Sequence, residues 1–319
     1  CDEQELHVTA LPKTLPESRP SAAADPTRAA NGVSVATPRY SRCTSSGAMR
    51  AQRTTSQQPA RLLVYTVSTG GYDIDALSDL RLSRRAVQGI DFIRFVDADG
   101  LALLSGRTYR WQTVLLNHSA GAATGGMSPA QRLSRDIKIR PHRYEIVWRY
   151  DASLYIDSNV RVHQPVHPLF ARVANGSADL GAYDFPRGLD GEAEWIRRYL
   201  TLKQPRFNST SAQWWLNRTL KQQVARYKAH GDHMWNRTMY GKVILRWHSA
   251  RIRLFGELWW REYSLGVPRD QLSFRFCARE AHRRCGFRAF SLGHNGRNGA
   301  RFWRYFGVSF GKQSRLAGF

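Results

Sequence analysis

The 319-residue sequence contains no apolar stretch near the roughly 20 residues needed to span a bilayer. We therefore expect any membrane association to come from an anchor upstream of Cys1. The motif HExxH is absent, which argues against the common zinc-protease site. A zinc-finger spacing and an RRM signature are also missing, so nucleic acid is not the expected partner.

Acidic residues are scarce, with 25 Asp and Glu against 48 Lys and Arg and a formal charge of +23. Residues 1–60 carry 7 of the basic and 5 of the acidic residues, so +21 lies on residues 61–319. The first 60 residues are rich in Ala, Ser, Thr, Pro and Gln, and their apolar residues show no regular helical or strand spacing. We therefore predict a disordered, low-complexity stem or linker at 1–60 and a folded domain at 61–319.

A basic folded domain needs an anionic partner. Its Arg residues are spread along the chain rather than gathered in one run. A nucleotide-sugar diphosphate, an acidic polysaccharide and an anionic membrane surface each fit such a charge, and the charge alone does not choose among them.

Two features favour an oxidising compartment. Five of the nine Asn residues lie in glycosylation sequons, where Ser and Thr frequency predicts about one or two: Asn117, Asn175, Asn208, Asn217 and Asn236. Cys277 and Cys285 are close enough in sequence for a disulfide around a short loop, although two free thiols are equally compatible. We expect a glycoprotein of the secretory pathway, in the Golgi lumen.

The centre of the sequence is the stretch Tyr150–Val162, in which the apolar run SLYI ends on Asp157-Ser158-Asn159. Such a run bounded by Asp and Asn predicts a buried strand of an α/β sheet, with its polar end at the carboxyl edge where these sheets bind ligands. A carboxylate followed two residues later by another oxygen ligand suits a hard cation. A simple turn explains the same residues.

Other segments complete an α/β pattern. Strands are predicted at 61–68, 89–96 (ending on Asp97), 179–185 and 242–248, and helices at 192–204, at 210–230 and from Pro268. The aromatic stripes of the first two helices, including Trp195, Tyr199, Trp214 and Trp215, are interpreted as core. Loops are expected at 115–134 and 292–296, and the basic run at 136–143 either neutralises a diphosphate or is a solvated face.

Three stretches go beyond this general pattern: VYTVSTGGYD, SLYIDSNVRV and WWREYSLGVPRDQLSF. In this order and at these separations they resemble the plant and algal glycosyltransferase-like family named for the turgor-regulation-defect and mucilage-related proteins. The resemblance runs from about residue 61 to 280. It implies a GT-A-like (Rossmann-like) mixed sheet flanked by helices, in a single catalytic domain at 61–319.

The same resemblance implies a set of site residues. The implied ligands of Mn²⁺ or Mg²⁺ are Asp157, Asn159 and His294. The implied donor-binding residues are Thr66, Asp97, Lys138, Arg246 and Gln271, and the implied catalytic residues are Asp270 and Glu257. The family's mid-domain His-Pro-x-Arg segment is replaced by Asp184-Phe185-Pro186-Arg187, which lacks the His, while Glu192 can still supply the acid that follows.

The implied reaction moves a hexose or uronic acid from a nucleotide-sugar donor, with a UDP-sugar favoured, to a cell-surface or cell-wall glycan with the help of a divalent metal. Two alternatives stay open. One is a ceramidase-like hydrolysis of a lipid amide, which has been assigned to a member of the family. The other is a non-catalytic binder of glycan or nucleic acid, which the charge and the missing His favour. The sequence leaves the oligomeric state open.

Overall fold

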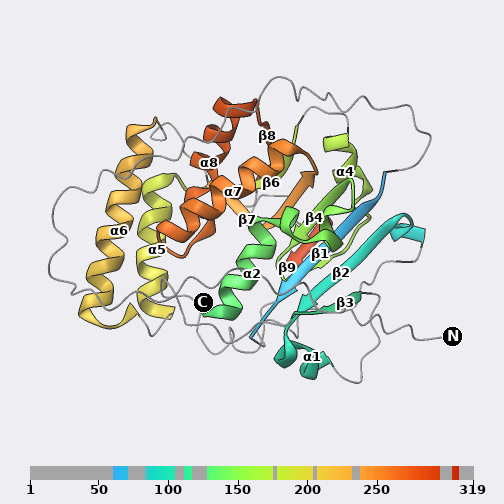
Figure 1. Cartoon of the computed structure of the whole chain (residues 1–319), viewed down its shortest axis with the longest axis horizontal. Helices are drawn as coiled ribbons and strands as arrows, with labels where there is room; N and C mark the ends of the chain where they lie inside the picture. Colours follow the sequence, from blue (N-terminus) through green and yellow to red (C-terminus); the bar gives the residue numbers. More distant parts are fainter. Residues whose placement is uncertain are drawn as a thin grey trace, which may run out of the picture. The chain divides into compact units, whose positions relative to one another are not determined.

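Figure 1 shows the computed structural model of the chain. The structure describes residues 60–70, 83, 85–104, 111–116, 128–174, 178–203, 207–231, 238–294 and 304–308. They all belong to one compact unit, Arg50–Phe319. The predicted stem at 1–60 lies outside the described residues except for its last residue. No described helix is long and apolar enough to cross a membrane.

A mixed seven-stranded sheet forms the centre of the described unit. In spatial order its strands are β3 (Gln112–Leu115), β2 (Ile90–Val96), β1 (Leu62–Ser68), β4 (Ala152–Ile156), β7 (Thr238–Trp247), β6 (Leu180–Phe185) and β8 (Ala289–His294). Neighbouring strands are parallel, except that β7 runs antiparallel to both β4 and β6. The strands predicted from apolar runs are confirmed, and β7 begins earlier than predicted.

The carboxyl ends of β1, β2 and β4 meet at one edge of the sheet, next to the amino-terminal half of β7. Ser68 pairs with Val96, and Ile156 pairs with Val243. The backbone N–H of Asp157 continues the β4–β7 ladder by donating to the Lys242 carbonyl at 2.8 Å. The polar residues that follow these strands are therefore held close together by backbone pairing.

Helices α2 (Pro129–Ile139), α7 (Ala250–Leu265) and α8 (Asp270–Cys285) cover one face of the sheet (Figure 1). Ser128 and Ser249 cap α2 and α7 by accepting hydrogen bonds from the amides three residues on. The indole N–H of the fully buried Trp259 donates to the Asp270 carbonyl at 2.8 Å. This bond ties α7 to the first turn of α8.

The opposite face packs against α4 (His167–Ala174) and a small antiparallel ribbon of β5 (Val160–Val162) and β9 (Phe306–Val308). Because both faces are covered, the central strands are nearly continuous apolar runs rather than alternating ones. Shorter elements complete the described chain: α1 (Ala98–Leu104), α3 (Glu145–Trp148) and 3₁₀ turns at Arg85–Val87 and Pro141–Arg143. The predicted α/β class, a mixed sheet flanked by helices, is confirmed.

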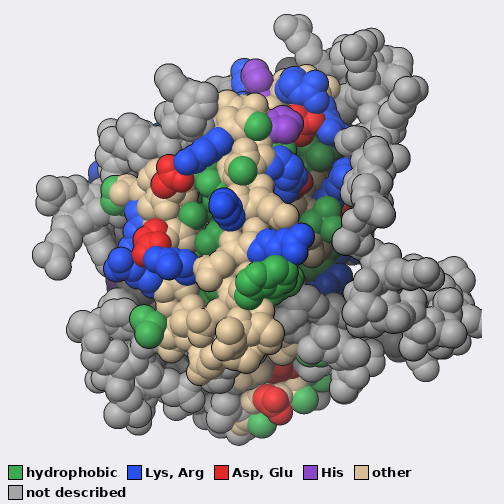
Figure 2. Space-filling view, turned by 90° about the vertical axis from the view of Figure 1, so that its left-hand side faces the viewer, with side chains coloured by type: hydrophobic (Ala, Val, Ile, Leu, Met, Phe, Trp, Pro, Cys, Tyr) green, Lys and Arg blue, Asp and Glu red, His purple; other side chains and the backbone are tan. Residues whose placement is uncertain are grey.

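Helices α5 (Leu189–Lys203) and α6 (Thr210–Ala229) lie side by side and form a third apolar cluster with Leu272 of α8 (Figure 1). The interpretation of their aromatic stripes as core holds only in part. Trp214 is 60% exposed and Trp215 is 37% exposed, so these two indoles face solvent. Figure 2 views this side of the molecule, where basic side chains are spread over the surface with acidic ones between them.

Two sequence-based expectations are wrong, and one of two open alternatives is excluded. Residues 129–134 are not loop, because Ser128 and Pro129 start α2 there. Residues 292–294 are the end of β8. Cys277 and Cys285 do not pair with each other, since both lie on α8 and eight residues of helix separate them by about 12 Å, beyond the roughly 7 Å limit for a disulfide.

Candidate functional site

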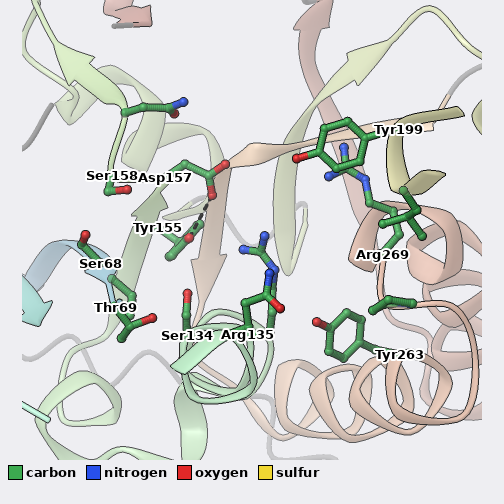
Figure 3. Close-up of a pocket in the computed structure, with 15 residues that line it drawn as sticks. Ser68, Thr69, Ser134, Arg135, Tyr155, Asp157, Ser158, Tyr199, Tyr263 and Arg269 are labelled. Atoms are coloured by element: carbon green, nitrogen blue, oxygen red, sulfur yellow. Dashed lines mark hydrogen bonds between the residues drawn. The ribbon is translucent and has the colours of Figure 1, made fainter. Parts of the chain in front are cut away.

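A cavity of about 210 Å³ opens at the carboxyl edge of the sheet, beside the ends of β1 and β4 (Figure 3). Helix α2 forms its floor in the view of Figure 3, and residues of α5, α7 and the turn before α8 form the opposite wall. The lining residues are Val67, Ser68, Thr69, Gln131, Ser134, Arg135, Tyr155, Asp157, Ser158, Asn159, Tyr199, Leu200, Tyr263, Pro268 and Arg269. This edge is where α/β sheets bind ligands, as predicted.

Asp157 lies at the cavity wall because it directly follows β4. Its Oδ1 accepts a hydrogen bond from the Tyr155 hydroxyl at 2.9 Å and an ion-pair contact from Lys138 Nζ at 3.4 Å. Burial by itself would raise the pKa of Asp157, but the positive charges of Lys138, Arg135 and Lys242 outweigh it and hold the pKa below its usual range. Asp157 is therefore a carboxylate at neutral pH.

Lys138 joins two carboxylates behind the cavity wall. Its ammonium lies 2.7 Å from Asp270 Oδ2 as well as 3.4 Å from Asp157 Oδ1, and its side chain is only 3% exposed. Burial would raise the pKa of Asp270, yet the charges of Lys138, Arg135 and Arg269 lower it well below the usual range. Gly241 leaves room for the pair, since a Cβ there would lie 3.3 Å from Lys138 Nζ.

Arg135 is the main residue that sequence reasoning missed. It lies one turn before Lys138 on α2, and its guanidinium points into the middle of the cavity (Figure 3). No carboxylate in the described part of the chain comes within 4.0 Å of it. Burial would lower the pKa of Arg135, but the more distant Asp270, Tyr263, Tyr155 and Asp157 raise it overall. Arg135 thus presents a permanent positive charge to a ligand.

The wall opposite Asp157 combines cations with aromatic rings. The Arg269 guanidinium lies 4.5 Å from the centre of the Trp195 ring, and Trp195 stacks on Tyr199 at 4.7 Å. Arg269 also donates to the Gln271 amide oxygen and lies 3.7 Å from the buried Glu192. Burial raises the pKa of Glu192, although Arg269 pulls it down. Gln271 therefore positions Arg269 rather than lining the cavity itself.

The described members of the ligand set predicted for a divalent cation, Asp157 and Asn159, do not fit one. Among the described residues no three His, Cys, Asp or Glu side chains gather into a metal site. The Asn159 amide oxygen accepts a hydrogen bond from Lys242 Nζ at 3.3 Å, and Asp157 faces Lys138, Arg135 and Lys242. A metal ion at this carboxylate would meet several like charges. His294 ends β8, but its side chain lies outside the described residues.

The remaining predicted donor-binding residues lie away from the cavity lining. Asp97 follows β2 at the same edge, and its two oxygens accept from the Gly70 and Gly100 amides at 2.5 and 2.9 Å. Thr66 is buried in the middle of β1. Arg246 is completely buried and donates to the Tyr65 hydroxyl at 3.1 Å and the Lys138 carbonyl at 2.6 Å, so it supports the end of α2.

Glu257, predicted as catalytic, lies on α7 outside the cavity lining. Its Oε1 is 2.7 Å from His142 Nε2, and its Oε2 is 3.5 Å from Arg140 Nη1. The structure thus brings Asp157 and Asn159 to the cavity and Lys138, Asp270 and Gln271 directly behind it. It does not bring Glu257 there.

Three comparisons with known proteins bear on this site. Residues 197–292 match the model of TOD1/MUCI70, glycosyltransferase-like domain. This match contains the third sequence motif, including Arg269, Asp270 and Gln271, whereas the first two motifs precede it. A search of the curated proteins finds no match.

Solved structures similar to the chain include several glycosyltransferases. Mouse xyloside xylosyltransferase 1 in its apo form has a TM-score of 0.39 and 11% identity, covering 73% of this chain and 85% of that one. Core-mannan synthase A from Aspergillus fumigatus in its Mn/GDP form has a TM-score of 0.40 and 6% identity, covering 69% of each chain. The mannosyltransferase Ktr4p from S. cerevisiae has a TM-score of 0.37 and 9% identity, covering 65% and 62%.

The sugar specificities and the bound Mn²⁺ and GDP in these descriptions are properties of those solved proteins. For this chain the family match is the finding that tests the sequence motifs, and it covers the segment from α5 to β8. Residues 197–292 are thus similar to the TOD1/MUCI70 glycosyltransferase-like domain, and this match confirms the resemblance predicted from the sequence.

Proposed function

We propose that the protein is a glycosyltransferase that uses a nucleotide-sugar donor, bound in the cavity beside Asp157. The observation that carries the proposal is the position of this cavity: it lies at the carboxyl edge of the sheet, and Arg135 points into it. The family match over residues 197–292 supports glycosyl transfer as the reaction class. A diphosphate is the part of such a donor that a basic cavity recognises.

In this reaction the bond between the sugar C1 and a diphosphate oxygen breaks, and its electron pair stays on the diphosphate. A new bond forms between C1 and an acceptor hydroxyl oxygen, whose proton leaves to a base or to water. Arg135 and Arg269 are placed to stabilise the charge that grows on the leaving group. The lowered pKa of Asp270 makes it a weak base, so it acts by holding Lys138 in place.

The finer assignments extend the same proposal. The transferred group is a hexose or uronic acid, UDP is the favoured carrier, and the acceptor is a cell-surface or cell-wall glycan. The ring of Tyr199, which lines the cavity and stacks on Trp195, suits a sugar ring. A place in the Golgi lumen is supported by the sequons at Asn208 and Asn217, both exposed in the structure. The sequons at 117, 175 and 236 lie outside the described residues.

The test is a thermal-unfolding scan of the full chain against UDP, GDP, ADP and dTDP in the presence of Mn²⁺. A ligand that binds only the native state raises stability by about 2.7 kcal/mol at a hundredfold excess over its Kd. We expect one of these nucleotides to raise the Tm of the native protein. If no nucleotide shifts the Tm, the proposed donor site is wrong.

The hydrolase alternative gains no support from the described residues. A Ser–His pair exists, with Ser153 Oγ 2.8 Å from His248 Nε2. Ser153 is completely buried within β4, and His248 Nδ1 faces the Tyr150 carbonyl at 2.7 Å rather than a carboxylate. A substrate cannot reach this hydroxyl, so the pair ties β4 to the end of β7 instead of forming a nucleophile.

A further inference from the structure

The cavity already holds an excess of positive charge. The acidic groups at its wall and directly behind it are Asp157, Asp270 and Glu192, and the basic groups are Lys138, Lys242, Arg135 and Arg269. Each carboxylate is matched by at least one of these cations, whereas Arg135 has no ion-pair partner within 4.0 Å among the described residues. A diphosphate entering the cavity therefore meets unsatisfied positive charge without any added ion.

The Lys138 ammonium also occupies the position between the Asp157 and Asp270 carboxylates. Lys138 Nζ lies 2.7 Å from Asp270 and 3.4 Å from Asp157, and it sits 5.1 Å from the centre of the Tyr155 ring. Its carbonyl accepts from the buried Arg246, which fixes the end of α2. A divalent cation that used both carboxylates would have to displace a buried ammonium.

We propose that this site works without a divalent metal, and that Arg135 binds the donor diphosphate and neutralises the leaving group. The inference rests on the proposed function and replaces the metal dependence predicted from the sequence. Arg135 is suited to this role because a guanidinium donates paired hydrogen bonds to phosphate oxygens and stays charged at any physiological pH. Lys138 serves as a positioning residue that keeps Asp157 and Asp270 compensated from behind.

The experiment is a calorimetric titration of the full chain with UDP, GDP, ADP and dTDP, in excess EDTA and again with Mn²⁺. For the nucleotide that binds, we expect Kd values in the two conditions to agree within about threefold, a difference of roughly 0.6 kcal/mol. Arg135→Met should weaken binding about 10- to 100-fold in both conditions, because a hydrogen bond to a charged group is lost. Arg135→Lys should restore part of the loss.

The matched control is Arg132→Met, which removes the same charge from the same helix. Arg132 is exposed and does not line the cavity, so its loss should change the Kd by less than about threefold. Thermal unfolding of each variant checks that the fold is intact. Binding that requires Mn²⁺, or wild-type affinity in Arg135→Met, would overturn this inference while leaving the proposed function standing. No binding in either condition would overturn both.

Discussion

Helix α2 and the turn after it supply basic side chains to two acid–base clusters that differ in burial. The inner cluster is Lys138 with Asp157 and Asp270, and both ends of its shortest contact are only 3% exposed. The outer cluster is Arg140, His142 and Glu257, in which the Glu257 side chain is 36% exposed. Similar residue types therefore form a buried, cavity-side network in one place and a surface network a few residues further on.

The two clusters also differ in what acid does to them. The inner carboxylates have lowered pKa values, so their contribution to stability is present above the usual Asp pKa of about 3.9 and is lost only as pH falls below it. The outer cluster continues through the Trp148 ring to His248, whose ring stacks on Trp148 at 4.4 Å. Burial lowers the pKa of His142, and it lowers the pKa of His248 to about 4.

The largest expected effect comes from removing the inner cation. Lys138→Met leaves the buried Asp270 carboxylate without its 2.7 Å partner, which costs about 3–5 kcal/mol and lowers the Tm by roughly 6–20 °C. Differential scanning calorimetry at pH 7 measures the change. Lys242→Met is the matched control, because Lys242 is half-buried and its 3.3 Å contact is to the neutral Asn159. Equal losses in the two variants would contradict the special position of Lys138.

The second-largest effect is a loss of folding stability at acidic pH, caused by protonation of His248. Its folded pKa of about 4 lies below the unfolded value of about 6.5, so the unfolded state binds the proton first as pH falls. Stability is then full above pH 6.5 and falls by up to about 3 kcal/mol towards pH 4. His248→Phe retains a ring against Trp148 and should flatten this slope, although it loses the bonds to Ser153 and Tyr150. Urea unfolding at several pH values gives the slope, and an unchanged slope would contradict the assignment.

Gly241→Ala tests how tightly the inner cluster is packed. The added Cβ would lie 3.3 Å from both Lys138 Nζ and Gln271 Cγ, so these two side chains must shift by a few tenths of an ångström. Overpacking of this kind costs about 1–3 kcal/mol. The Tm should fall, and nucleotide affinity should fall with it because Arg269, Asp270 and Gln271 share the same turn. Gly191→Ala, with its nearest contact at 3.8 Å, is the control that should lose no nucleotide affinity.

Comparison with the sequence predictions separates what local patterns encode from what packing decides. The strands were predictable because continuous apolar runs end on Asp or Gly, and the position of Asp157 at the sheet edge follows from the end of β4. Arg135 was not predictable in this way, because the Gly- and Ala-rich segment before it concealed the start of α2. Reading Ser128-Pro129 as a helix start would have placed Arg135 and Lys138 on one helical face.

Tertiary packing decided the rest of the site. Arg246 and Thr66 end or occupy predicted strands, yet their side chains point into the interior, and a strand pattern gives no measure of depth. Helix α7 was not predicted, although Phe255, Trp259 and Tyr263 recur at helical spacing and are buried on one face of it. Of these, Tyr263 reaches the cavity only because α7 packs across the end of α2.

Glu257→Gln should have the smallest effect, and it tests the distinction between the two clusters directly. The side chain is 36% exposed and its partners are Arg140 and His142, so loss of its charge should cost no more than about 1 kcal/mol. Because Glu257 lies outside the cavity lining, the affinity for a nucleotide should stay within about twofold of the wild type, a difference of roughly 0.4 kcal/mol. Calorimetric titration beside a thermal scan measures both. A stable variant that bound nucleotide normally but failed to transfer sugar would restore the catalytic role predicted for Glu257, and the outer cluster would then face the acceptor.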